Sequence, residues 1–139
     1  MAADDDPMTK QIIACAIEVH RALGPGLLES AYEQCMAHEL SLRALGFGTQ
    51  VPVPVLYKGL PLDCAYKADL IIEHDVVVEL KSVDLISPMH QAQLLTYLKL
   101  TGARVGLLIN FNVRRLADGV TRFHRLPRQA AAGSGGTSR

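Results

Sequence analysis

The sequence predicts an α/β fold, and three observations support this prediction. In the first third of the 139-residue chain, apolar residues recur at the three- and four-residue spacing of amphipathic helices. Further along, the spacing changes to the alternation of strands, broken by turn residues. A capped helix and a mostly apolar strand then follow. A chain of this length is expected to bury these elements in one layered domain.

Two helices are expected before the strands. Residues 8–23 carry apolar side chains at helical spacing, and the Gly-Pro-Gly sequence after them ends this helix. A second helix is expected over residues 27–45, where Gly46 ends it.

Two hairpins are expected in the middle of the chain. The first joins residues 51–57 to residues 60–66 through a Lys-Gly turn, and the prolines in its first strand indicate a sheet edge because proline donates no ladder hydrogen bond. The second joins residues 67–72 to residues 76–83 through a Glu-His-Asp turn.

A third helix and further strands complete the expected fold. Ser87 is a suitable N-cap and Pro88 suits the first helical position, so a helix is expected from there to Gly102. Residues 105–111 are mostly apolar, which favours a strand buried on both faces. A short strand is expected over residues 120–126.

One domain is expected over residues 8–128, with disordered ends at residues 1–7 and 129–139 because these segments are polar or rich in small residues. The acidic start differs from a secretory signal, and no run approaches the roughly 18 apolar residues of a spanning helix. A cytoplasmic location without membrane contact is therefore expected. The widely spaced cysteines are expected to be core thiols.

The second hairpin brings two acids together. If it turns at His74, antiparallel pairing places Asp69 opposite Glu79 and Lys67 opposite Lys81. Two carboxylates then face each other, flanked by two lysines. The alternate positions are apolar and are expected to pack on the other sheet face: Leu70, Ile72, Val76, Val78 and Leu80.

Opposed carboxylates destabilise a sheet unless a cation lies between them or one of them is protonated. Oxygen ligands without nearby histidine or cysteine clusters favour Mg²⁺ or Mn²⁺ over Zn²⁺. The alternative is a purely structural square of salt bridges among the two acids and the two lysines.

Three motifs then resemble those of a known superfamily. Asp69 followed by Glu79-Leu80-Lys81 resembles the D-x(n)-E-x-K signature of PD-(D/E)XK nucleases, although Ala68 replaces the nominal proline. The segment from Gly26 to Tyr32 matches GxxExxY, the motif that names a family of small proteins assigned to this superfamily. The segment Gln93-Leu94-Leu95-Thr96-Tyr97 resembles the QxxxY motif of the RecB-like and Cas4-like branch.

The resemblance implies a restriction-endonuclease-like αβββαβ core with a mixed central sheet flanked by helices. It also implies Mg²⁺-dependent hydrolysis of phosphodiester bonds, with DNA as the expected partner. Asp69, Glu79 and the backbone carbonyl of Leu80 would ligate the metal. Glu29 would add a third carboxylate or hold a metal-bound water, and Lys81 would orient or deprotonate the attacking water.

Other motif residues have a structural alternative beside the functional one. Gln93 and Tyr97 would face the site as catalytic residues, or would form with His90 a solvent-exposed helical stripe. Tyr32, Lys67 and His90 are possible substrate contacts, but Tyr32 would equally suit a core aromatic. Glu29 would also be favourable at a helix N-terminus without any catalytic role.

The charge distribution leaves a second hypothesis open. The formal net charge is zero, with acids concentrated near the start of the chain and arginines near its end. The basic end is suited to a phosphate backbone or simply to solubility. The chain is therefore expected to be a nuclease or, alternatively, a catalytically silent nucleic-acid-binding or assembly module with the same fold, and it is a candidate homo-oligomer.

Overall fold

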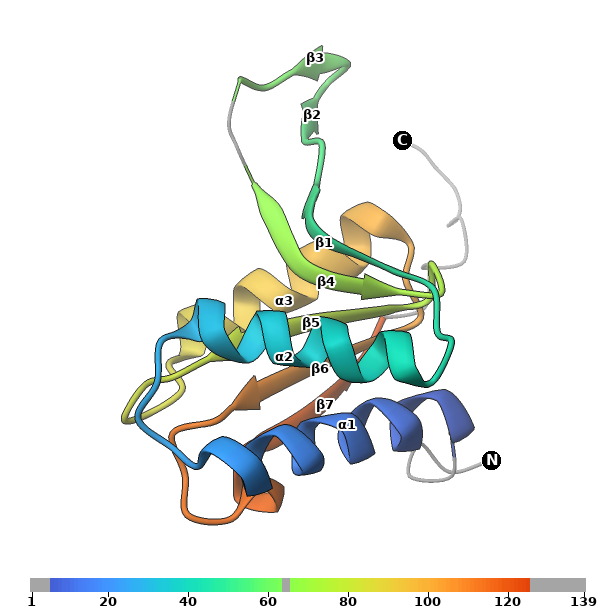
Figure 1. Cartoon of the computed structure of the whole chain (residues 1–139). Helices are drawn as coiled ribbons and strands as arrows, with labels where there is room; N and C mark the ends of the chain where they lie inside the picture. The colour runs from blue at the N-terminus through green and yellow to red at the C-terminus, as the bar shows by residue number, and fades with distance from the viewer. Residues whose placement is uncertain (1–5, 64–65, 126–139) are drawn as a thin grey trace.

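The computed structural model describes residues 6–63 and 66–125. A five-stranded sheet in the order β1-β4-β5-β6-β7 forms its centre, with α1 and α2 on one face and α3 on the other (Figure 1). The elements are α1 (Pro7–Leu23), α2 (Glu29–Leu42), β1 (Phe47–Pro52), β2 (Leu56–Tyr57), β3 (Leu60–Pro61), β4 (Lys67–Ile72), β5 (Val76–Lys81), α3 (Pro88–Thr101), β6 (Val105–Asn110) and β7 (Val120–His124).

The sheet is mixed, which confirms the expected α/β class. β4 pairs antiparallel with β1 and with β5, β5 pairs parallel with β6, and β6 pairs antiparallel with β7. A parallel pair needs a long crossover connection, and α3 provides it between β5 and β6. β1 lies at the sheet edge, as its proline predicted.

Each sheet face has its own apolar core. The core under α1 and α2, here called the α1–α2 core, contains the five alternate hairpin residues that were expected on one face. The core under α3, here called the α3 core, is smaller and is formed by Val53, Ala68, Val77, Leu94, Tyr97, Leu98, Ala103 and Leu108.

The expected hairpin register is correct, but the paired ladder is shorter than expected. Leu70 pairs with Val78 and Ile72 with Val76, as a turn at His74 requires. The ladder between β4 and β5 ends at the Leu70 pair, whereas on the other edge of β4 the ladder with β1 continues to the pair of Lys67 and Pro52. The expected backbone pairings of Asp69 with Glu79 and of Lys67 with Lys81 are therefore wrong, because the β4–β5 ladder stops before both.

The first expected hairpin has different bounds. β1 begins at Phe47 and ends at Pro52, because the second proline two residues on cannot continue the ladder. β2 and β3 form a separate two-stranded sheet that projects beyond the main sheet as an arm (Figure 1). The Lys58-Gly59 turn between them is as expected, with both residues at positive φ.

The helix ends follow from local chemistry. α1 begins at Pro7, one residue earlier than expected, because Asp6 caps it and proline suits the first turn. α2 ends at Leu42, earlier than expected, and Ala44 has a φ of 58° that no helix continues. Most of the N-terminal segment expected to be disordered, and the whole C-terminal one, lie outside the described residues.

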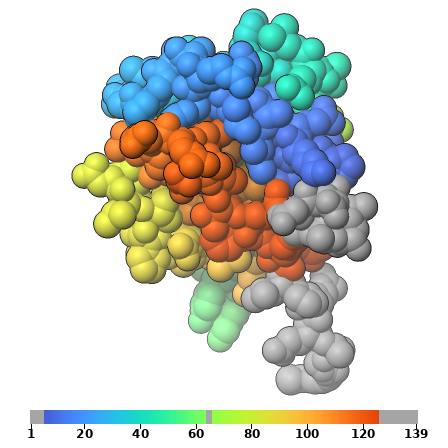
Figure 2. All heavy atoms as spheres, turned by 90° about the horizontal axis from the view of Figure 1, so that it is seen from below, coloured from blue at the N-terminus to red at the C-terminus, as the bar shows by residue number. Residues whose placement is uncertain are grey.

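The face opposite the arm is formed partly by α1 and by the chain between β6 and β7, which lie side by side (Figure 2). His20 joins them, since its Nε2 lies 2.8 Å from the carbonyl oxygen of Val113. This histidine is 9% exposed, and its ring lies 6.4 Å from that of Phe111.

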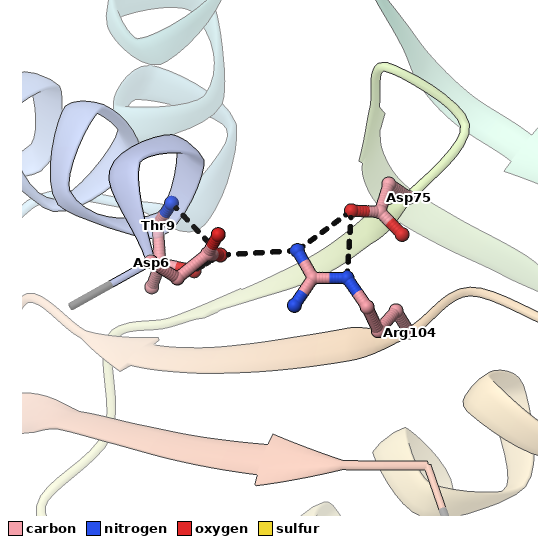
Figure 3. Close-up of polar contacts among 4 residues, drawn as sticks. All are labelled: Asp6, Thr9, Asp75 and Arg104. Carbon is pink, nitrogen blue, oxygen red and sulfur yellow. Dashed lines mark hydrogen bonds and ion pairs between the residues drawn. The ribbon is translucent and has the colours of Figure 1, made fainter. Parts of the chain in front are cut away.

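A network of charged residues ties the start of α1 to the sheet. The Arg104 guanidinium contacts Oδ2 of Asp6 at 3.1 Å and Oδ2 of Asp75 at 2.8 Å (Figure 3). Asp6 also caps α1 by accepting hydrogen bonds from the backbone and hydroxyl of Thr9 (Figure 3). The Thr9 hydroxyl, followed by the Arg104 guanidinium, lowers the pKa of Asp6 below its ordinary 3.8.

Replacing Arg104 by alanine should lower the free energy of unfolding by about 1 kcal/mol, because each partly exposed ion pair contributes up to about that amount. Asp6 has a lowered pKa in the folded state, so its stabilising contribution is present above its ordinary pKa and is lost as the pH falls through the folded value. Urea unfolding at pH 7 and pH 3 measures both effects. Arg21→Ala, which removes the exposed pair with Glu18, is the control and should have a smaller effect; an equal effect would contradict the role of the network.

Candidate functional site

The expected acid pair lies where β4 separates from β5. The backbone N–H of Asp69 donates to Oε2 of Glu79 at 2.8 Å, and the backbone N–H of Leu80 donates to Oδ2 of Asp69 at 2.8 Å. Each carboxylate thus accepts a backbone hydrogen bond from the opposite strand. These bonds replace the ladder that would otherwise continue here, and they hold the two acids side by side.

Glu79 is the most perturbed group of the site. It is only 4% exposed, and burial followed by the nearby Asp69 charge raises its pKa to about 7. Lys81 opposes this increase through its positive charge. A buried carboxylate held beside a second one is destabilised when ionised. A cation between them would remove that cost.

Tyr97, on α3, lies near enough to the same acids for their charges to act on its phenol. It is 3% exposed, and burial, followed by the Glu79 and Asp69 carboxylates, raises the pKa of its phenol. Gln93, one turn earlier, is half-buried on the same helix. The solvent-exposed stripe is therefore wrong for Tyr97, which belongs to the α3 core.

Sequence reasoning missed two residues beside Asp69. The Nε2 atom of Gln50 donates to Oδ1 of Asp69 at 3.1 Å and to Oε1 of Glu33 at 2.6 Å. Glu33 follows Glu29 by one helical turn, so the helical period placed it on the same side of α2. Nothing in the local sequence distinguished Gln50.

Glu29 is the first residue of α2, and its side chain contacts the chain at the end of β5. Its Oε2 accepts a hydrogen bond from the backbone N–H of Ser82 at 3.1 Å, directly after Lys81. Among residues 6–63 and 66–125, no group of three acidic, histidine or cysteine side chains is arranged to hold a metal. The structure therefore places Glu29 beside the lysine end of the site and does not group it with Asp69 and Glu79.

Tyr32 is a core residue, and its expected role as a substrate contact is wrong. It is fully buried and stacks on Phe111 with ring centroids 4.2 Å apart. Its hydroxyl donates to the carbonyl of Gly24 at 2.6 Å and accepts from the backbone N–H of Leu27 at 3.2 Å. Tyr32 thus fixes the loop that leads to Glu29.

Tyr32→Phe should lower the free energy of unfolding by about 1–2 kcal/mol, because it leaves the Leu27 N–H and the Gly24 carbonyl without this partner. The aromatic stacking on Phe111 would remain. Thermal unfolding measures the change, and Tyr57→Phe on the exposed arm is the control. A neutral Tyr32→Phe would show that the hydroxyl does not hold the loop.

Lys67 and His90 are the two remaining possible substrate contacts, and they differ in how far their side chains are already engaged. Lys67 is exposed at the start of β4, two residues before Asp69. His90 forms a capping box with Ser87, in which its Nδ1 accepts from the Ser87 N–H at 3.0 Å. One ring nitrogen of His90 is therefore engaged in holding the start of α3.

The donor set fits a hard divalent cation. An ionised carboxylate offers about four acceptor positions, and the hydrogen bonds above leave capacity on both acids. Oxygen donors from one or two carboxylates, completed by water, are the usual Mg²⁺ environment. Asp69 and Glu79 are the residues that would hold the ion.

An α/β fold with an acid on each of two diverging strands, and a lysine two residues after the second acid, defines a nuclease-type architecture. The chain belongs to the PD-(D/E)XK nuclease superfamily, because a family model of that description matches residues 6–123. Members of this superfamily are generally metal-dependent nucleases.

Other comparisons add little. The chain is similar to the crystal structure of SSO0001, with 19% sequence identity, a TM-score of 0.47, and coverage of 92% of this chain and 82% of that chain. The comparison with curated proteins gave no match. Across the part of the chain that the structure describes, the helices are too short or too polar to cross a membrane.

Proposed function

We propose that this protein is a Mg²⁺- or Mn²⁺-dependent nuclease that hydrolyses phosphodiester bonds of DNA. The observation that carries the proposal is the interlocked pair of Asp69 and Glu79, beside Leu80 and Lys81, in a chain of the nuclease superfamily. The GxxExxY motif and the QxxxY motif support a finer placement in the GxxExxY family and near the RecB-like and Cas4-like branch.

Asp69 and Glu79 are proposed as the carboxylate ligands, and the carbonyl of Leu80 as the backbone ligand. The Leu80 N–H points to Asp69, and the N–H and C=O of one strand residue lie on the same strand edge. The bound metal would supply a nucleophilic water at neutral pH and a counter-charge for the phosphorane.

The other side chains act around this pair. Lys81 is proposed to orient or deprotonate the attacking water and to stabilise developing negative charge as a point charge. Half-buried Gln93 is proposed to hold the substrate from the α3 side, buried Tyr97 to position the two acids from behind, and exposed Lys67 to contact the substrate phosphates. Glu29, placed beside Ser82, suits the holding of a metal-bound water more than direct ligation.

Incubation of the purified protein with labelled single- and double-stranded DNA tests this function. We expect cleavage with Mg²⁺ or Mn²⁺ and none with EDTA. The control is Asp118→Asn, which neutralises an acid in the turn before β7, outside the proposed site. Absence of cleavage with either metal, in protein shown by calorimetry to bind Mn²⁺, would contradict the proposal.

A silent assembly or nucleic-acid-binding module is the second candidate. Its support is the arm, where Leu56, Tyr57 and Leu60 are each more than half exposed, and the zero formal net charge. Salt-sensitive DNA binding that persists in a Glu79→Ala, Lys81→Ala double variant, without turnover in the wild type, would favour it over catalysis.

A further inference from the structure

Gln50 has an uncommon backbone conformation in the edge strand. Its φ is 48°, which non-glycine residues seldom adopt. The core packing changes sheet face at this point: in β4, Leu70 packs in the α1–α2 core and Ala68 in the α3 core. In the neighbouring segment, Phe47 likewise packs against the α1–α2 core, whereas Val53 packs in the α3 core.

The backbone pairing is interrupted at the same place. Thr49 pairs with Leu70 and Val51 with Ala68, but the ladder omits the intervening pair of Gln50 and Asp69. The two strands therefore meet there through side chains. The Gln50 carboxamide reaches the Asp69 carboxylate across the gap.

The Gln50 amide completes a chain of hydrogen bonds from α2 to the site. Its Nε2 lies 2.6 Å from Oε1 of Glu33 and 3.1 Å from Oδ1 of Asp69. Oδ2 of Asp69 is already held by the Leu80 N–H. Both oxygens of the Asp69 carboxylate are thus anchored, one by backbone and one by Gln50, and the plane of the carboxylate is fixed.

We propose that Gln50, anchored by Glu33, is a positioning residue that orients the Asp69 carboxylate for metal binding. This inference rests on the proposed function, because it assigns Gln50 to the same site. Partners behind a metal ligand fix the orientation of that ligand and typically contribute 10- to 100-fold to metal affinity. A strained backbone conformation retained beside a site is consistent with such a role.

Two substitutions separate positioning from a merely structural role. Gln50→Gly relieves the positive φ and removes the amide, whereas Gln50→Met keeps the side-chain length and removes only the hydrogen bonds. His74→Gly is the matched control, because His74 has a φ of 55° at the opposite end of β4. Mn²⁺ affinity is measured by calorimetry and stability by urea unfolding.

We expect both Gln50 variants to bind Mn²⁺ about 10- to 100-fold more weakly than the wild type. Gln50→Gly should nevertheless keep or raise the unfolding midpoint, as His74→Gly should, while His74→Gly leaves the Mn²⁺ affinity unchanged. Weaker metal binding without lost stability would distinguish positioning from structural support.

The results that overturn the proposal are distinct from those that overturn the function. Unchanged Mn²⁺ affinity in both Gln50 variants, or a loss of affinity that parallels a loss of stability, would refute the role of Gln50 and leave the nuclease proposal standing. A wild-type protein that binds no Mn²⁺ would refute both, beginning with the metal site itself.

Discussion

Lys81→Met should reduce the rate of DNA cleavage by about 1000-fold while leaving Mn²⁺ affinity within a few fold of the wild type. The lysine charge acts on water and on the transition state, and removal of a positioned proton-transfer group typically lowers rates by about 10²- to 10⁴-fold. Single-turnover cleavage with saturating Mn²⁺ measures the chemical step.

Lys67→Met is the matched control for this change. Lys67 is exposed two residues before Asp69, so its loss should raise KM and reduce the salt dependence of binding with little effect on kcat. Equal losses of kcat in the two variants would show that Lys81 has no special part in catalysis. Loss of Mn²⁺ binding in Lys81→Met would instead assign the lysine to the structure of the site.

Glu79→Gln should have opposite effects on stability and on metal binding. The pKa of Glu79 is raised to about 7 from its ordinary 4.5, so between these pH values the folded protein holds a proton that the unfolded chain releases. Its stability therefore falls as the pH rises through this window. One pKa unit corresponds to about 1.4 kcal/mol, so the rise from 4.5 to about 7 predicts that Glu79→Gln stabilises the metal-free protein by up to about 3 kcal/mol at pH 8.

The same substitution should abolish Mn²⁺ binding, because it removes a charged ligand. The Gln carbonyl can still accept the hydrogen bond from the Asp69 N–H, so the local structure should be kept. Urea unfolding of both proteins at pH 5 and pH 8, with and without Mn²⁺, measures all of these effects. Glu73→Gln at the far end of the hairpin is the control. If Glu79→Gln were less stable than the wild type at pH 8, this would contradict the claim that ionised Glu79 destabilises the folded protein.

Much of the fold could be predicted because local signals agreed with one another. Ser87 and Gly102 mark the bounds of α3 through a capping box and a left-handed end. The register around His74 followed from a short turn and from alternating apolar residues, and the structure has that register. The proximity of Asp69 and Glu79 could be anticipated for the same reason, although backbone-to-carboxylate hydrogen bonds, and not the ladder, join them.

What could not be predicted depends on contacts between distant segments. The β4–β5 ladder ends at Leu70 while the β1–β4 ladder continues to Lys67, and no local pattern encodes this difference. The burial of Tyr32 depends on Phe111, far along the chain. Gln50 has no distinguishing neighbours in the sequence, and its positive φ coincides with a change of sheet face that involves a distant strand.

The central claim is that Asp69 and Glu79 hold a divalent metal beside Lys81, and a crystal soaked with Mn²⁺ tests it most directly. We predict an anomalous density peak between the two carboxylates, about 2.1 Å from one oxygen of each, with Glu29 outside direct coordination. The same soak of Glu79→Gln crystals should lack the peak. A wild-type crystal with no peak at this position, at Mn²⁺ concentrations that support cleavage, would contradict the claim.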